Sequence, residues 1–180
     1  NINFNIPFIY QTLKNLKYFE KKIQGLIIGC FEGHSTIFFL MYTQNSFFEC
    51  VDNWNQENLI KYSLNAEDYF DKNLQIYKNR IKKNKKDSKT FFKENKKNFD
   101  LIYIDGSHFH DDVESDCLNS FFKLNDNGLL IINSVFWRGK KWKLRHNNLA
   151  GIIRFLKKIK SYEILLITRN TLFLRKLSYK

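Results

Sequence analysis

The chain is poor in proline and cysteine, and both shortages narrow what it can be. One proline in 180 residues excludes a proline-rich linker or a polyproline segment. The three cysteines (Cys30, Cys50 and Cys117) are far apart and form no Cys-x-x-Cys pair, which excludes a disulfide framework and a zinc knuckle. We expect each to behave as a small buried apolar residue in a reducing compartment.

The chain also lacks a long apolar run. No segment approaches the ~20 residues of a membrane-spanning helix, and no basic segment followed by an apolar core opens the sequence as a signal peptide would. The first residue is Asn1 in place of Met, which suggests a trimmed N-terminus. We therefore expect a cytoplasmic protein with no membrane partner.

Acidic residues are few relative to basic ones. The chain has 18 Asp and Glu against 30 Lys and Arg, and a formal net charge of +12. Such a balance is typical of proteins with an anionic partner, and also of a merely lysine-rich solvated surface. The length suits a single domain, which we divide into an N-terminal helical segment, 1–22, and a core, 23–180.

Short apolar runs alternate with amphipathic stretches along the chain. We expect strands at 25–28, 47–51, 80–82, 99–104 and 129–132, helices at 8–22, 35–42, 90–95, 111–122 and 149–160, one or two helices within 55–77, a turn at 125–128, and a hairpin of strands 162–167 and 171–177. Alternating strands and helices predict an α/β fold, a three-layer doubly wound (Rossmann-like) sandwich.

Three of these strands end in residues suited to ligand binding. Gly29 and Gly33 follow the first strand, where glycine allows a sharp turn and close approach of a ligand. Alone, this pair is equally typical of an ordinary strand-to-helix turn. Asp52 ends the second strand, roughly twenty residues on, the spacing of a nucleoside-binding unit whose acid accepts both ribose hydroxyls. Asp52 is equally placed to cap a following helix.

The ends of the next two strands carry further candidates. Asp87 and Ser88 follow the third strand and are placed either to contact the amine of an adenine or to form a solvated turn. Asp105 and His108 follow the fourth strand. His108 has an intrinsic pKa suited to a general base, and Asp105 is suited to ligating a metal or orienting a hydroxyl. The alternative is that both residues brace the loop. We expect catalysis from this pair.

Four segments, in order, carry a resemblance to one enzyme family. They read L-I-I-G-C-F-E-G-H-S-T at 26–36, C-V-D at 50–52, F-D-L-I-Y-I-D-G-S-H at 99–108 and N-G-L-L-I-I-N-S-V-F-W at 127–137. The chain resembles a class I S-adenosylmethionine-dependent methyltransferase, above all a small bacterial family with the F-D-L-I-Y-I-D-G-S-H motif. Phe70-Asp71-x-Asn73 also belongs to the shared pattern.

The resemblance implies a mostly parallel seven-stranded sheet with an antiparallel C-terminal hairpin. It also implies S-adenosyl-L-methionine as cofactor, with Asp52 on the ribose. The cofactor-binding residues expected on this basis, together with the strand ends, are Gly29, Phe31, Glu32, Gly33, Ser35, Asp52, Asp87, Ser88 and Asp105. His108 would then be the base, and Asp105 would orient it or the acceptor.

Two departures from the family pattern matter. Ile27 replaces an acid in the first motif, and Asn133-Ser134 replaces an acidic pair that holds a divalent cation in related O-methyltransferases. Neutral side chains are weak ligands for a hard cation, so we expect no metal site.

Three functions remain open. The first is O-methylation of a small molecule. A sugar is one acceptor considered, and an anionic or phosphorylated acceptor is another, which the basic segment from Arg138 to Arg145 would suit. The second is nucleic-acid methylation, which the net charge and the aromatic residues Phe136, Trp137 and Trp142 suit. Against it, the chain lacks the Asp/Asn-Pro-Pro-aromatic motif that is usual in enzymes that methylate amino groups of nucleic acids. The third is a catalytically degenerate binding protein. The oligomeric state is open.

Overall fold

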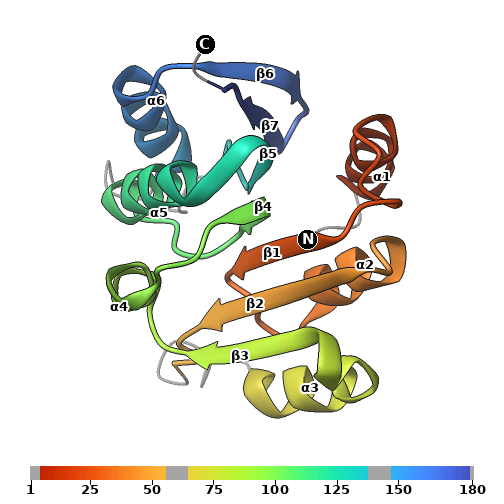
Figure 1. Ribbon diagram of the computed structural model, residues 1–180. Coiled ribbons are helices and arrows are strands. Elements are labelled where there is room, and N and C mark those ends of the chain that lie inside the picture. Colours follow the sequence, from red (N-terminus) through yellow and green to blue (C-terminus); the bar gives the residue numbers. More distant parts are fainter. Residues whose placement is uncertain (1–4, 56–64, 138–146, 179–180) are drawn as a thin grey trace.

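The computed structural model describes residues 5–55, 65–137 and 147–178 (Figure 1). The helices are α1 (Ile6–Asn15), α2 (His34–Tyr42), α3 (Ala66–Asn73), the 3-10 helix η4 (Gln75–Arg80), α4 (Ser88–Glu94), α5 (His110–Lys123) and α6 (Asn148–Lys158). The strands are β1 (Ile23–Ile28), β2 (Ser46–Asp52), β3 (Ile81–Lys85), β4 (Phe99–Ile104), β5 (Leu124–Asn133), β6 (Tyr162–Ile167) and β7 (Thr171–Lys176).

The strands form one seven-stranded sheet in the order β3-β2-β1-β4-β5-β7-β6. The first five pair in parallel, and β7 lies antiparallel to both β5 and β6. The order reverses between β1 and β4, so these two strands lead to helices on opposite faces of the sheet, and the carboxyl ends of strands at such a reversal are where open α/β sheets bind ligands. The predicted Rossmann-like sandwich with its antiparallel C-terminal hairpin is confirmed.

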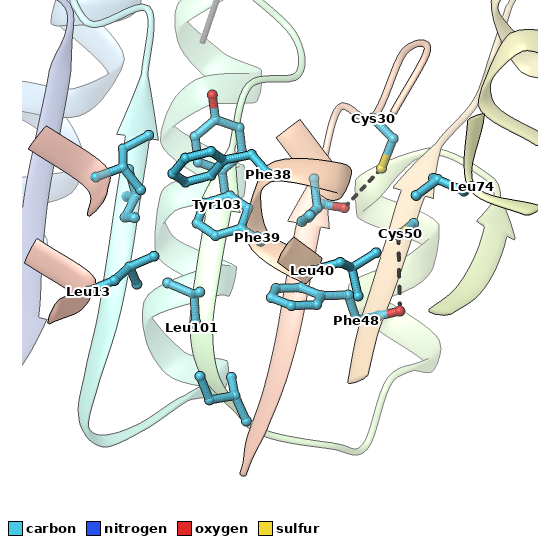
Figure 2. Close-up of a cluster of buried hydrophobic side chains, with 14 of the residues drawn as sticks. Leu13, Cys30, Phe38, Phe39, Leu40, Phe48, Cys50, Leu74, Leu101 and Tyr103 are labelled. Atoms are coloured by element: carbon cyan, nitrogen blue, oxygen red, sulfur yellow. Dashed lines mark hydrogen bonds between the residues drawn. The ribbon is translucent and has the colours of Figure 1, made fainter. Parts of the chain in front are cut away.

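Helices cover both faces of the sheet, which explains the nearly continuous apolar strands. Figure 1 shows α1, α2 and α3 on one face. Their side chains meet alternate strand residues in one apolar cluster, part of which Figure 2 shows: Leu13 of α1 and Phe39 of α2 pack with Phe48, Leu101 and Tyr103 of the sheet.

The opposite face carries α4, α5 and α6 (Figure 1). Phe91, Cys117 and Phe155 of these helices pack against the other set of strand side chains, including Ile102 and Leu130. Cys30, Cys50 and Cys117 are all buried free thiols, as the sequence predicts.

Most predicted boundaries differ from the structure by one to three residues, and two differ by more. The first helix ends at Asn15 rather than at residue 22, because Lys17 takes a left-handed conformation (φ 58°) that stops it. Residues 125–128 do not form a separate turn but lie within β5, where the register against β4 shifts and Asn127 has φ 60°. The basic segment 138–145 and most of 55–64 lie outside the described residues.

Candidate functional site at the carboxyl edge of the sheet

Gly29 begins the loop between β1 and α2, and its position requires glycine. Its φ is +83°, and a Cβ there would lie 2.2 Å from the backbone oxygen of Asp105. The loop after β1 therefore touches the loop after β4. Gly33 also has a positive φ (+91°) and forms the N-cap of α2. Both glycines shape the loop, as the sequence predicts.

Asp52 ties this loop to the end of β2. Its Oδ2 accepts hydrogen bonds from the backbone amides of Cys30 (2.8 Å) and Phe31 (2.9 Å), and its Oδ1 accepts one from the amide of Trp54 (2.9 Å). A carboxylate offers about four acceptor positions. The three amides leave room for one further donor, rather than for the two hydroxyls of a bidentate ribose contact.

Trp54 holds the same loop against α3, a role that the sequence did not reveal. Its indole Nε1 donates to the backbone oxygen of Phe31 (2.8 Å), and its ring packs edge-on against Phe70 of α3, with centroids 4.9 Å apart. The neighbouring Asn73 donates to the backbone oxygen of Glu32 (2.9 Å). The shared Phe70-Asp71-x-Asn73 pattern could have pointed to this contact, because it joins α3 to the loop.

The remaining predicted loop residues line the same edge. Phe31 is 42% exposed and has φ 47°. Glu32 is half-buried, with its carboxylate 3.9 Å from His34 Nδ1. Ser35 lies in the first turn of α2, next to the hydroxyl of Tyr103.

Asp87 and Ser88 start α4. Asp87 is its N-cap and accepts from both the amide and the hydroxyl of Thr90 (2.8 Å each), and these bonds lower the pKa of its carboxyl. The Ser88 hydroxyl donates to Oδ1 of Asp116 on α5 at 2.5 Å. Asp116 is 2% exposed, and burial raises the pKa of its carboxyl to about 7. The sequence analysis missed Asp116.

Asp105 follows β4 and faces Ser134, whose hydroxyl donates to its Oδ1 at 3.2 Å. Beneath it lies Tyr103, fully buried, with its hydroxyl directed away from the apolar cluster (Figure 2). That hydroxyl lies near Ser35 and Asp105 but has no hydrogen-bond partner among the described residues. Burial, reinforced by the Asp105 charge, raises the pKa of Tyr103. The site thus contains an unsatisfied polar group.

His108 is held from two sides. Its ring stacks on Trp137, with centroids 4.2 Å apart and an interplanar angle of 20°, and its Nδ1 lies 3.1 Å from Nδ2 of Asn148. That Nδ2 also donates to the backbone oxygen of Ser134 (2.9 Å). This bond fixes the orientation of the amide, because the reversed amide would place its own oxygen against the Ser134 oxygen. His108 Nδ1 therefore accepts, and the neutral ring carries its proton on Nε2.

Asn133 is not available as a metal ligand. Its amide oxygen accepts from Asn5 Nδ2 (3.2 Å) and from Thr171 Oγ1 (3.0 Å), which occupies both lone pairs. Asp105 is then the carboxylate that accepts a hydrogen bond from Ser134. This donor set does not suit a divalent cation, and the described residues contain no group of three or more His, Cys, Asp or Glu side chains placed to hold a metal ion.

The loop residues after β4 enclose a small pocket with the end of β5 and the start of α6. It is lined by Ile104, Asp105, Gly106, Ser107, His108, Val113, Ile132, Asn133 and Asn148. The structure thus brings Asp105 and His108 into one pocket. The loop after β1, which is tied to Asp52, lies beside this pocket because Gly29 touches Asp105. Asp87 and Ser88 lie at the neighbouring strand end, after β3.

Within the described residues, no helix has the length and apolar character needed to cross a membrane.

Similar structures share this architecture. An O-methyltransferase from Bacillus cereus in complex with SAH aligns with a TM-score of 0.72 at 14% identity, over 96% of this chain and 80% of that one. A Staphylococcus aureus protein assigned as a caffeoyl-CoA O-methyltransferase gives 0.72 at 17%, over 96% and 83%. A Clostridium thermocellum protein assigned as an rRNA methylase gives 0.73 at 10%, over 98% and 97%.

Comparison with curated protein sequences gives no significant match. The family described as a methyltransferase domain, by contrast, matches residues 26–135, which is more than half of the chain and runs from the middle of β1 to just past the end of β5. This stretch contains the glycine loop, Asp52, Asp105 and His108. The chain therefore belongs to the methyltransferase domain family.

Proposed function

We propose that the chain binds S-adenosyl-L-methionine and transfers its methyl group to an oxygen of a small molecule. The observation that carries this proposal is the contact between two strand ends: the Gly29 loop, tied to Asp52, lies directly against Asp105. A nucleoside held by the first and an acceptor held by the second would be neighbours. The SAH-bound neighbour from Bacillus cereus supports the same cofactor.

The residues of this chain fit such a ligand in three ways. The remaining acceptor position of Asp52 suits one ribose hydroxyl. The unsatisfied Tyr103 hydroxyl, near Ser35, suits a polar group of the ligand entering over β4. Phe31, exposed at the rim, suits an apolar contact. S-adenosylmethionine would supply a methyl group on a positively charged sulfur, an electrophile that needs only an aligned nucleophile.

Asp105 and His108 divide the acceptor chemistry. The sequence predicts His108 as the base, but that role at Nε2 requires the tautomer whose Nδ1–H would face the Asn148 amide. We propose instead that Asp105 receives the proton of the acceptor hydroxyl and that His108 Nε2–H donates a hydrogen bond that orients the acceptor. Such a donor suits an anionic or phosphorylated acceptor, or a sugar hydroxyl.

Titration calorimetry with SAH and S-adenosylmethionine, with and without magnesium, tests the cofactor. We expect micromolar binding that magnesium does not change. Asp52→Ala should weaken it at least about tenfold, because it removes the ribose acceptor and releases the loop amides. Asp126→Ala, an exposed acid on β5, is the matched control. No binding by the wild-type protein would refute the proposal and leave a degenerate binding protein.

Nucleic-acid methylation is the second candidate, favoured by the net charge of +12 and by the fold of the Clostridium thermocellum neighbour. Phosphate contacts release counterions, so RNA affinity would fall steeply with salt. RNA binding measured from low to physiological salt, followed by methyl transfer to the bound RNA, distinguishes this candidate from a small-molecule enzyme.

A further inference from the structure

The buried carboxyl of Asp116 lies between two loops at the ligand-binding edge. Its Oδ1 accepts a hydrogen bond from Ser88, the first residue of α4, which directly follows the short loop after β3 and the Asp87 cap. Its Oδ2 lies 3.8 Å from where a Cβ of Gly106 would stand, in the loop after β4. Asp116 therefore joins the strand ends on either side of the β1–β2 ligand loops.

This place is where the base of a nucleoside would lie. The backbone amide of Lys86, directly after β3, donates to the backbone oxygen of Asp52 (3.0 Å), so the turn that leads to Ser88 is anchored to the proposed ribose residue. Figure 1 shows α4 and α5 on the same face of the sheet. A ribose at Asp52 directs its base toward this turn and toward Gly106.

The hydrogen-bond direction at Ser88 then decides what the base must offer. A hydroxyl has one proton and two lone pairs. When the proton goes to an ionised Asp116, Ser88 presents only lone pairs to the ligand. The amine of a 6-amino purine donates to such an oxygen, whereas the carbonyl of a 6-oxo purine opposes it.

We propose that Asp116 determines the base specificity of the cofactor site by fixing Ser88 as an acceptor, so that the site selects a 6-amino over a 6-oxo purine. This inference rests on the proposed cofactor. The groups that face the Asp116 carboxyl are Ser88 and Lys89 of α4, the N-cap Asp87 of α4, and Asp112, which lies on α5 as Asp116 does. Burial raises the pKa of the Asp116 carboxyl to about 7, so above this pH Asp116 is ionised and Ser88 is fixed as an acceptor.

The test is calorimetry at pH 8 with SAH and with S-inosylhomocysteine, in which a carbonyl replaces the amine. We expect the wild-type protein to bind SAH about tenfold more tightly. Ser88→Ala should reduce this ratio to near one, because it removes the acceptor. Asp116→Asn should reduce it as well, because an amide that turns its N–H toward Ser88 releases the hydroxyl proton to the ligand. A purely structural role would weaken both ligands equally and leave the ratio unchanged.

Asp126→Asn, which replaces an exposed acid on β5, is the matched control and should preserve the ratio. Equal binding of both ligands by the wild-type protein, or an unchanged ratio in Ser88→Ala, overturns the inference. A wild-type protein that binds neither ligand refutes the proposed cofactor instead. Thermal melts of each variant verify folding.

Discussion

Replacing Asp116 with asparagine should change how stability depends on pH. The folded protein holds this carboxyl at a pKa of about 7, against 3.8 for an ordinary aspartate, because burial disfavours its charged form. In the unfolded chain it ionises freely near pH 4. Between these values the unfolded state binds fewer protons than the folded one, so the free energy of unfolding falls as pH rises.

The magnitude follows from the difference between the two pKa values. Each unit corresponds to about 1.4 kcal/mol, so the full loss is about 4 kcal/mol, complete above pH 7 and absent below about pH 4. Roughly 3 kcal/mol of it falls between pH 5 and pH 8. Asp116→Asn carries no charge and retains a polar partner for Ser88. It should lack this slope and be the more stable protein at pH 8.

Urea unfolding followed by tryptophan fluorescence, at several pH values from 5 to 8, measures the effect. Other groups titrate in the same range, so the quantity of interest is the difference between wild type and Asp116→Asn at each pH. Asp126→Asn, exposed on β5, should follow the wild-type profile. Parallel profiles for wild type and Asp116→Asn would refute the reasoning, because they would mean that the buried carboxyl ionises as it does in water.

Three further outcomes follow from the site. Gly29→Ala should lower the free energy of unfolding in urea by about 3 kcal/mol or more, because it combines a left-handed φ with a Cβ contact of 2.2 Å. The control Gly106→Ala, whose Cβ would meet nothing closer than 3.4 Å, should lower it by less than about 1 kcal/mol. Equal losses in the two variants would contradict the close contact of the two loops. Tyr103→Phe should raise the free energy of unfolding by about 1 kcal/mol, because it removes a buried hydroxyl without a partner; a loss of stability would reveal a partner. Once an acceptor is found, His108→Gln should retain more of kcat/KM than His108→Ala, because its amide N–H replaces the Nε2 donor; if both variants lose activity equally, His108 acts as the base.

Most of the fold was predictable because its signals are local. Short apolar runs such as 99–104, placed between amphipathic stretches, favour buried strands between helices, and β4 spans the same six residues in the structure. The weak strand near Ile81 was harder, because β3 is an edge strand rich in lysine and lacks the apolar signature of its neighbours.

The site was predictable in part. The positions of Gly29, Asp52, Asp105 and His108 at strand ends follow from the strand assignments, because parallel strands present their carboxyl ends at one edge. Their hydrogen-bond partners do not follow. Asn133 looked like a free replacement for a metal ligand, yet it bonds to Asn5 from the other end of the chain.

The sequence by itself determined the order of strands and helices, the glycines of the loop and the polar residues at each strand end, because these depend on neighbours along the chain. Only the tertiary structure decided how those residues are used. Asp52 is largely occupied by backbone amides, Asn148 selects the tautomer of His108, and Asp116 bonds to Ser88. Each of these facts depends on a distance of a few ångströms between residues far apart in sequence, which no local pattern encodes.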